Sequence, residues 1–164
     1  MKKTPLDKYS ELVNSGEVFP DSSQKETASH LNKLFLDLNR TSLHPSLEYL
    51  RRYFGVPIPR RYIKNIRGLY LCGGVGRGKT MLMDMFYSCL PEGMGQRYHF
   101  HRFMQRVHEE LTKRRGTKNP IDSIAEQFAA ESQVICFDEF YVSDIADALI
   151  LSELLKAVIL SRSK

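Results

Sequence analysis

The spacing of apolar residues divides the chain into a helical beginning and a core in which strands alternate with helices. Asp21 or Ser22 can cap a first helix, since both side chains accept hydrogen bonds from the free amides of a first turn. The apolar face of that helix repeats every three or four residues and consists of Ala28, Leu31, Leu34, Phe35 and Leu38. Residues 42–66 are irregular and contain prolines, with one short helix expected at 47–54. We therefore expect residues 1–66 to form an α-helical lead-in with a basic linker, and residues 67–164 to form the core.

Within the core, apolar runs and alternating stretches predict strands at 68–72, 97–103 and 134–137. Helical spacing and terminating glycines and prolines predict helices at 81–90, from the second strand to about 115, and at 119–131. A last helix is expected from a cap at Ser143 or Asp144 to about residue 160. Strands that alternate with helices predict an α/β fold, in which a parallel sheet is flanked by helices.

A glycine-rich segment lies between the first predicted strand and its helix. It fits the pattern G-x-x-x-x-G-K-[ST] and consists of Gly73, Gly74, Val75, Gly76, Arg77, Gly78, Lys79 and Thr80. Glycine lets the backbone take positive φ and turn its N–H groups inward, and the following helix adds the positive end of its dipole. The segment therefore predicts a loop that binds the phosphates of a nucleoside triphosphate, called the P-loop below. We expect Lys79 to reach the β- and γ-phosphates and Thr80 to bind Mg²⁺.

Two acidic residues follow the third predicted strand, whose four residues are all apolar. Ligands of open α/β sheets bind beyond the carboxyl ends of the strands, which is where Asp138 and Glu139 stand. Asp138 is expected to bind Mg²⁺ through a water molecule, because this ion keeps most of its hydration shell. Glu139 is expected to orient or deprotonate the attacking water. With the P-loop, these acids predict a hydrolytic, Mg²⁺-dependent nucleoside triphosphatase of the P-loop class.

Composition favours a cytoplasmic protein. A chain of 164 residues with 42% hydrophobic content can bury the core of one domain. No apolar run approaches the roughly 20 residues that span a bilayer, and no apolar stretch follows the charged N-terminus as in a secretory signal. Cys72, Cys89 and Cys136 lie in expected core elements, without the spacing of metal ligands, as in a reducing compartment.

Two groups of residues leave alternatives open. Residues 1–70 hold 12 lysines and arginines against 7 acids, which accounts for the whole net charge of +5. Many of these cations fall between Arg51 and Arg67 among aromatic residues, which predicts either a solvated connector or a docking surface for nucleic acid or an acidic protein. His99, His101 and His108 are close in sequence, yet no acid or cysteine completes a ligand set, so structural roles are favoured over a metal site.

Three segments together resemble the ZapE family of AAA-type ATPases. They are residues 68–84 around the P-loop, 99–111 with the sequence HFHRFMQRVHEEL, and 136–148 with CFDEF and VSDI. The resemblance extends to Ser15, Gly16, Pro20, Asp21 and Gln24 near the N-terminus. It implies phosphate binding by residues 73–80, Mg²⁺ binding by Thr80 and Asp138, and water activation by Glu139. Bacterial members are similar to a cell-division ATPase that associates with the FtsZ ring, and mitochondrial relatives are linked to protein quality control.

The resemblance also implies a longer protein. Members of the family continue with a strand that carries a polar sensor residue, further helices, and an arginine finger that acts across a subunit interface. The chain is therefore expected to be an N-terminal portion, incomplete at its C-terminus, of a protein that remodels a protein assembly as a homo-oligomer. Alone, it is expected to bind or hydrolyse nucleotide poorly. The alternatives are a nucleic-acid-associated ATPase of the helicase-loader type, and a nucleotide-binding module without turnover.

Overall fold

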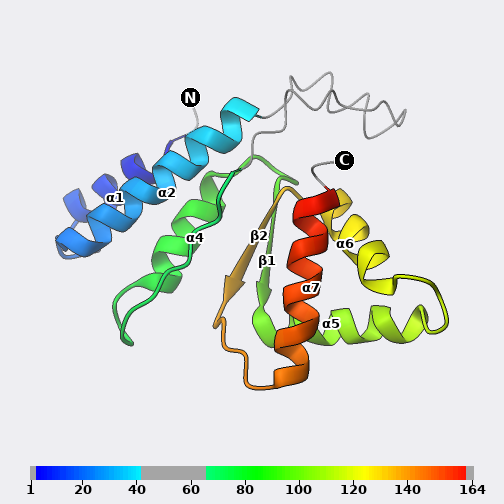
Figure 1. The fold of residues 1–164 in the computed structure, drawn as a ribbon. Coiled ribbons are helices and arrows are strands. Elements are labelled where there is room, and N and C mark those ends of the chain that lie inside the picture. The colour runs from blue at the N-terminus through cyan, green and yellow to red at the C-terminus, as the bar shows by residue number, and fades with distance from the viewer. Residues whose placement is uncertain (1–2, 42–65, 162–164) are drawn as a thin grey trace. The chain divides into compact units, whose positions relative to one another are not determined.

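A computed structural model describes residues 3–41 and 66–161 (Figure 1). Its elements are α1 (Pro5–Asn14), α2 (Ser22–Thr41), α4 (Lys79–Cys89), β1 (Gly95–His99), α5 (Phe100–Lys113), α6 (Pro120–Glu131), β2 (Val134–Asp138) and α7 (Ile145–Ser161). They form two compact units, Met1–Leu90 and Pro91–Lys164, and each unit is described by itself. The helix expected at 47–54 and most of the basic stretch lie outside the described residues. Within residues 3–41 and 66–161, every helix is too short or too polar to cross a membrane.

The first unit packs α1, α2 and α4 against one another. Helix α2 confirms the predicted helix, and Asp21 is its cap, since Asp21 Oδ1 accepts hydrogen bonds from the amides of Ser23 at 2.8 Å and Gln24 at 3.1 Å. The core of the unit is apolar and consists of Tyr9, Ala28, Leu31, Phe35, Leu38, Leu82, Met85, Phe86, Cys89 and Leu90. Four of these residues belong to the apolar face predicted for α2, and they bury it against the neighbouring helices.

Helix α1 was not predicted as a separate element, although its start has a recognisable pattern. Thr4 Oγ1 accepts from the amide of Asp7 at 3.3 Å, and Asp7 Oδ2 accepts from the amide of Thr4 at 3.0 Å. These reciprocal bonds form a capping box, and Pro5 occupies the first helical position, where no amide hydrogen is needed.

The prediction of a strand at 68–72 is wrong. Residues 66–74 form no strand, and Tyr70 is 71% exposed. Cys72 is exposed as well, which corrects the expectation that all three cysteines lie in the core. A strand needs a neighbour to complete its hydrogen-bond ladder, and the sheet of the described residues contains only β1 and β2. Residues 68–72 are not part of that sheet.

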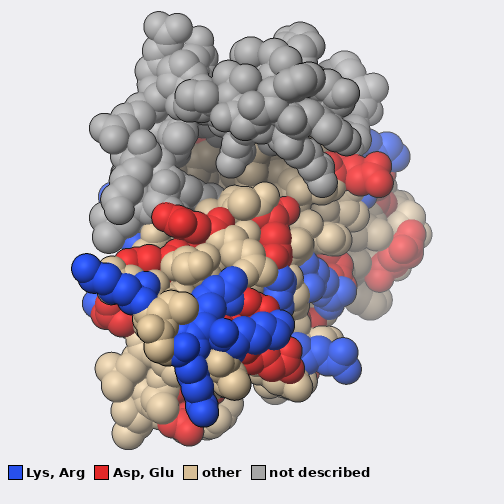
Figure 2. Space-filling model, turned by 90° about the vertical axis from the view of Figure 1, so that its right-hand side faces the viewer, with Lys and Arg blue, Asp and Glu red and all other residues tan. Residues whose placement is uncertain are grey.

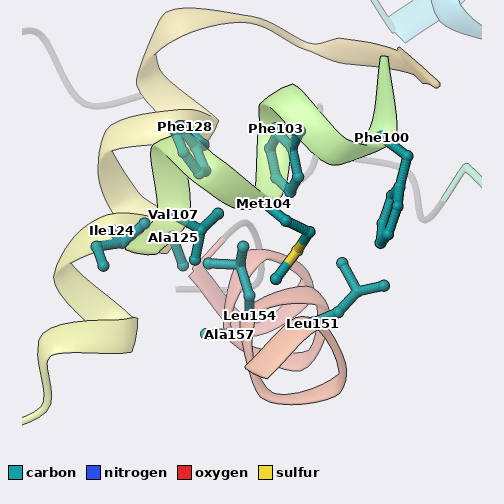
Figure 3. Packing of buried hydrophobic residues seen from close by; sticks show 10 residues of the cluster. All are labelled: Phe100, Phe103, Met104, Val107, Ile124, Ala125, Phe128, Leu151, Leu154 and Ala157. Atoms are coloured by element: carbon teal, nitrogen blue, oxygen red, sulfur yellow. The ribbon is translucent and has the colours of Figure 1, made fainter. Parts of the chain in front are cut away.

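The second unit contains a parallel pair of strands and three helices. Strands β1 and β2 pair in parallel, from Gly95 opposite Val134 to His99 opposite Asp138. This confirms a parallel arrangement for two of the predicted strands. The main core lies among α5, α6 and α7 (Figure 3) and consists of Phe100, Phe103, Met104, Val107, Ile124, Ala125, Phe128, Leu151, Leu154 and Ala157.

The boundary between β1 and α5 shows how local signals compete. The strand predicted at 97–103 ends at His99, and α5 begins at Phe100. Phe100, Phe103 and Val107 share one buried face at helical spacing, and burying this face against two helices outweighs the short alternation. The cap of α7 is Asp144, whose Oδ1 accepts from the amide of Ala146 at 2.7 Å. Helix α6 begins at its proline as predicted.

Candidate functional site

The P-loop lies in the first unit and leads directly into α4. Three of its glycines take positive φ, with +149° at Gly73, +77° at Gly76 and +77° at Gly78. Residues with a side chain rarely adopt positive φ, so glycine is required for the path of the loop. The prediction that the motif bends through positive φ is confirmed at these positions.

The end of the P-loop is the start of a helix without a side-chain cap. Gly78 is the N-cap of α4 and makes no capping bond through a side chain, and the first helical hydrogen bond is donated by the amide of Leu82 to Gly78 O at 2.9 Å. The amides before that bond lie at the positive end of the helix dipole. Such an end is suited to an anion, because an anion satisfies both the amides and the dipole.

Lys79 connects the two ends of the P-loop. Its Nζ donates hydrogen bonds to Gly73 O at 2.9 Å and to Gly74 O at 2.8 Å. An ammonium group has three N–H donors, so these two bonds leave one donor and the full positive charge for a bound phosphate. The first residue of α4 thus places a cation across the glycine-rich turn.

The beginning of α2 contacts the P-loop at Arg77 and Gly78. The Arg77 guanidinium lies 3.4 Å from Asp21 Oδ2, and Gln24 Nε2 donates to Arg77 O at 3.4 Å. A Cβ on Gly78 would lie 3.1 Å from Gln24 Nε2. Sequence reasoning did not find these contacts, because Gln24 and Arg77 are 53 positions apart and no spacing rule joins them. The only signal was the presence of Asp21 and Gln24 in the family resemblance.

The two predicted acids lie in the second unit, at the end of β2. Asp138 is the last residue of the strand, its side chain is 14% exposed, and its Oδ2 accepts from the Arg97 guanidinium of β1 at 2.9 Å. Glu139 is exposed and has φ of +51°, an unusual conformation for a residue other than glycine. Its amide donates to Asp138 Oδ1 at 3.1 Å. The turn after β2 therefore orders the Asp138 carboxylate and leaves Glu139 in solvent.

The three histidines lie apart from the P-loop in sequence and belong to the second unit. His99 ends β1, His101 lies in the first turn of α5, and their rings stack with centroids 6.0 Å apart. His108 Nε2 lies 2.7 Å from Asp147 Oδ1, which links α5 to α7. Over residues 3–41 and 66–161, no group of three His, Cys, Asp or Glu side chains is arranged to hold a metal ion.

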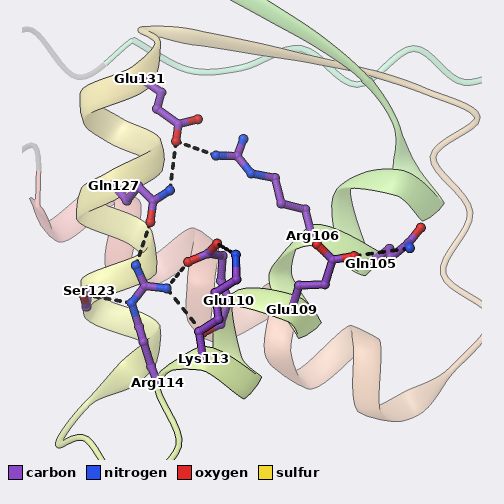
Figure 4. A network of polar contacts seen from close by, with 9 residues as sticks. All are labelled: Gln105, Arg106, Glu109, Glu110, Lys113, Arg114, Ser123, Gln127 and Glu131. Carbon is purple, nitrogen blue, oxygen red and sulfur yellow. Dashed lines mark hydrogen bonds and ion pairs between the residues drawn. The ribbon is translucent and has the colours of Figure 1, made fainter.

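A network of ion pairs joins α5 to α6 (Figure 4). Arg106 pairs with Glu131, and Arg114 pairs with Glu110 and also donates to Gln127 Oε1 at 2.7 Å. Hydrogen bonds from Lys113 and then Arg114 lower the pKa of Glu110 to about 2. On the face drawn in Figure 2, basic and acidic side chains lie side by side. The cations that close α5 thus stabilise the helix pair.

The family model described as AFG1-like ATPase matches residues 3–162, which is nearly the whole chain.

Individual proteins are similar as well. The chain is 48% identical over 159 residues to the cell division protein ZapE of Escherichia coli K12, covering 94% of this chain and 42% of that protein. An uncharacterised protein of Schizosaccharomyces pombe is 34% identical over 186 residues, covering 94% of this chain and 40% of its own. The lactation elevated protein 1 homolog B of Danio rerio is 46% identical over 103 residues, covering 56% of this chain and 20% of that protein. No solved structure matches.

Proposed function

This chain belongs to the AFG1-like ATPase family, and we propose that it binds ATP in the P-loop and hydrolyses it with Mg²⁺. The chain spans 42% of the length of its bacterial relative. We therefore propose the ATPase activity for the intact, longer protein. The observation that supports it most directly is the P-loop itself, where three glycines take positive φ and Lys79 Nζ bridges Gly73 O and Gly74 O. This arrangement has the donors and the charge that a polyphosphate requires.

The roles of the residues follow from their chemistry. The amides of residues 73–80 bind the phosphate oxygens, and Lys79 neutralises charge on the β- and γ-phosphates. As the family resemblance implies, the Thr80 hydroxyl and, through a water molecule, the Asp138 carboxylate would hold Mg²⁺, which prefers oxygen ligands, and the ion would offset the negative charge of the phosphates. Arg97 keeps the Asp138 carboxylate oriented through its 2.9 Å contact. Glu139 accepts the proton of the attacking water.

Turnover of ATP by the intact protein tests this assignment. Glu139→Gln keeps the size of the side chain and removes the base, so ATP binding should persist while turnover falls about 100-fold or more. Glu126→Gln, an exposed change on α6, is the matched control and should leave turnover unchanged. Unchanged turnover in Glu139→Gln would show that another group activates the water. An intact wild-type protein that neither binds nor hydrolyses ATP would refute the proposed function.

On a larger scale, we propose that ATP hydrolysis remodels a protein assembly of cell division in the cytoplasm. The identity of 48% to a protein named for cell division supports this, and the resemblance suggests the FtsZ ring as client and a homo-oligomer as the working form. Pelleting of FtsZ polymers should fall when the intact protein and ATP are added together. The same amount of polymer with and without ATP would argue against this client.

The nucleic-acid alternative rests on the basic stretch between Arg51 and Arg67. It predicts binding to single-stranded DNA whose affinity falls steeply with salt, because each phosphate contact releases counterions. Weak binding with a shallow salt slope would exclude this alternative and favour the protein client.

A further inference from the structure

Gln24 is placed at the junction between the P-loop and helix α4. Its Nε2 donates to the carbonyl oxygen of Arg77, the residue before Gly78, at 3.4 Å. A Cβ built on Gly78 would meet Gln24 Nε2 at 3.1 Å and Met81 Cε at 3.4 Å. The Gln24 carboxamide and the Met81 thioether thus border the same point of the loop.

The position of Gln24 is fixed by its own helix. Its amide donates to Asp21 Oδ1 at 3.1 Å, as part of the cap of α2, and the same Asp21 pairs with Arg77 through its other oxygen. The backbone of Asp21 is held in turn by Tyr9, whose hydroxyl donates to Asp21 O at 3.1 Å. The backbone of Gln24 is therefore anchored, while its side chain ends in one long hydrogen bond.

The carboxamide oxygen of Gln24 has an unusual environment. Oε1 is buried, and the part of the chain that the structure describes supplies no hydrogen-bond partner for it. A buried acceptor without a donor costs free energy, and such atoms are rare enough that each calls for an explanation. Among the described residues, the side chain is held by the weak 3.4 Å bond to Arg77 O, so it can turn toward a ligand that offers a donor.

We propose that Gln24 selects the adenine base of the bound nucleotide. This inference rests on the proposed function, since it assumes that the P-loop holds the phosphates. A glutamine binds adenine with two hydrogen bonds, in which its oxygen accepts from the 6-amino group and its nitrogen donates to N7. Guanine carries an oxygen at position 6, so two acceptors would face each other and the Gln24 oxygen would stay unsatisfied. The thioether of Met81 adds an apolar, polarizable surface beside the base.

Nucleotide analogues test the proposal without altering the protein. ATP, GTP and purine riboside triphosphate, which lacks the 6-amino group, are titrated with Mg²⁺ into the intact wild-type protein. A good bidentate pair is worth about 1–3 kcal/mol, so ATP should bind roughly 5- to 150-fold more tightly than either analogue. Equal affinity for ATP and purine riboside triphosphate would overturn the proposal.

A variant then identifies the residue that makes the distinction. In Gln24→Leu, ATP should bind as weakly as purine riboside triphosphate does to the wild type, and removal of the 6-amino group should no longer matter. Asn32→Leu is the matched control, because Asn32 Oδ1 is likewise buried without a partner in the described ranges and lies farther along α2. This control should keep the preference for ATP.

The outcomes separate this proposal from the proposed function. If Gln24→Leu weakens all three nucleotides by the same factor, Gln24 only supports the loop and the base-reading role is wrong. If the folded wild type binds none of them, the proposed function fails and takes this inference with it. Thermal melting of both variants verifies that they fold.

Discussion

Replacing Gly78 by alanine adds a Cβ at the point where the P-loop meets α2. Gly78 has φ of +77°, and a residue with a Cβ pays about 1–2 kcal/mol in that conformation. The added carbon would also lie 3.1 Å from Gln24 Nε2 and 3.4 Å from Met81 Cε. Both atoms end flexible side chains that can move, so most of the loss in unfolding free energy should come from φ. We expect Gly78→Ala to destabilise the first unit by about 1–2 kcal/mol.

Gly16→Ala is the matched control for the backbone term. Gly16 lies in the same unit, has φ of +79°, and would place its Cβ with nothing within 4 Å. Urea unfolding should therefore show a similar loss for both variants, with any excess in Gly78→Ala due to the displaced Gln24 side chain. Calorimetric titration with Mg·ATP should show weaker binding only for Gly78→Ala.

Two results would refute this reasoning. A Gly78→Ala protein as stable as the wild type would mean that the loop does not take positive φ there. A variant that loses stability but binds ATP with unchanged affinity would mean that the nucleotide does not use this loop.

Three other predictions concern the second unit, each measured by urea unfolding. Leu154→Ala should cost about 2–5 kcal/mol because the side chain is 1% exposed, whereas Leu155→Ala, 44% exposed, should change little; equal losses would contradict the packing of α7. Glu110, whose pKa is lowered to about 2, should contribute stability that is present above the usual carboxyl pKa of 4.5 and lost as pH falls toward 2. Glu110→Gln should therefore flatten the pH dependence in that window, and an unchanged slope would contradict it. Asp144→Ala should cost about 1 kcal/mol through the lost cap of α7, and a loss below a few tenths would exclude that cap.

The features that the sequence predicted correctly depend on neighbouring residues. The caps at Asp21 and Asp144 each join a side chain to amides within three positions, and α6 begins at Pro120, whose ring suits a first helical position. The glycines of the P-loop follow the same logic, since positive φ is a property of single residues. Local rules of this kind can be applied without knowing what the segment packs against.

The features that could not be predicted from the sequence depend on partners far away in the chain. Residues 68–72 have the composition of a buried strand, but a strand also requires a neighbour in register, which composition does not reveal. The contacts of Asp21 and Gln24 with Arg77 bring together segments far apart in the chain, and only the fold of the first unit makes them visible. The roles of Thr80, Asp138 and Glu139 stay predictions that the proposed experiments test.

The most direct test of the account is a calorimetric titration of the intact protein with Mg·ATP, with Lys79→Ala and the exposed control Lys156→Ala beside it. Because Lys79 Nζ carries the positive charge that bridges the P-loop, its removal should weaken ATP binding at least about 10-fold, and Lys156→Ala should bind like the wild type. No heat of binding in the folded wild type, or equal affinity in Lys79→Ala, would contradict the claim that this loop holds the nucleotide.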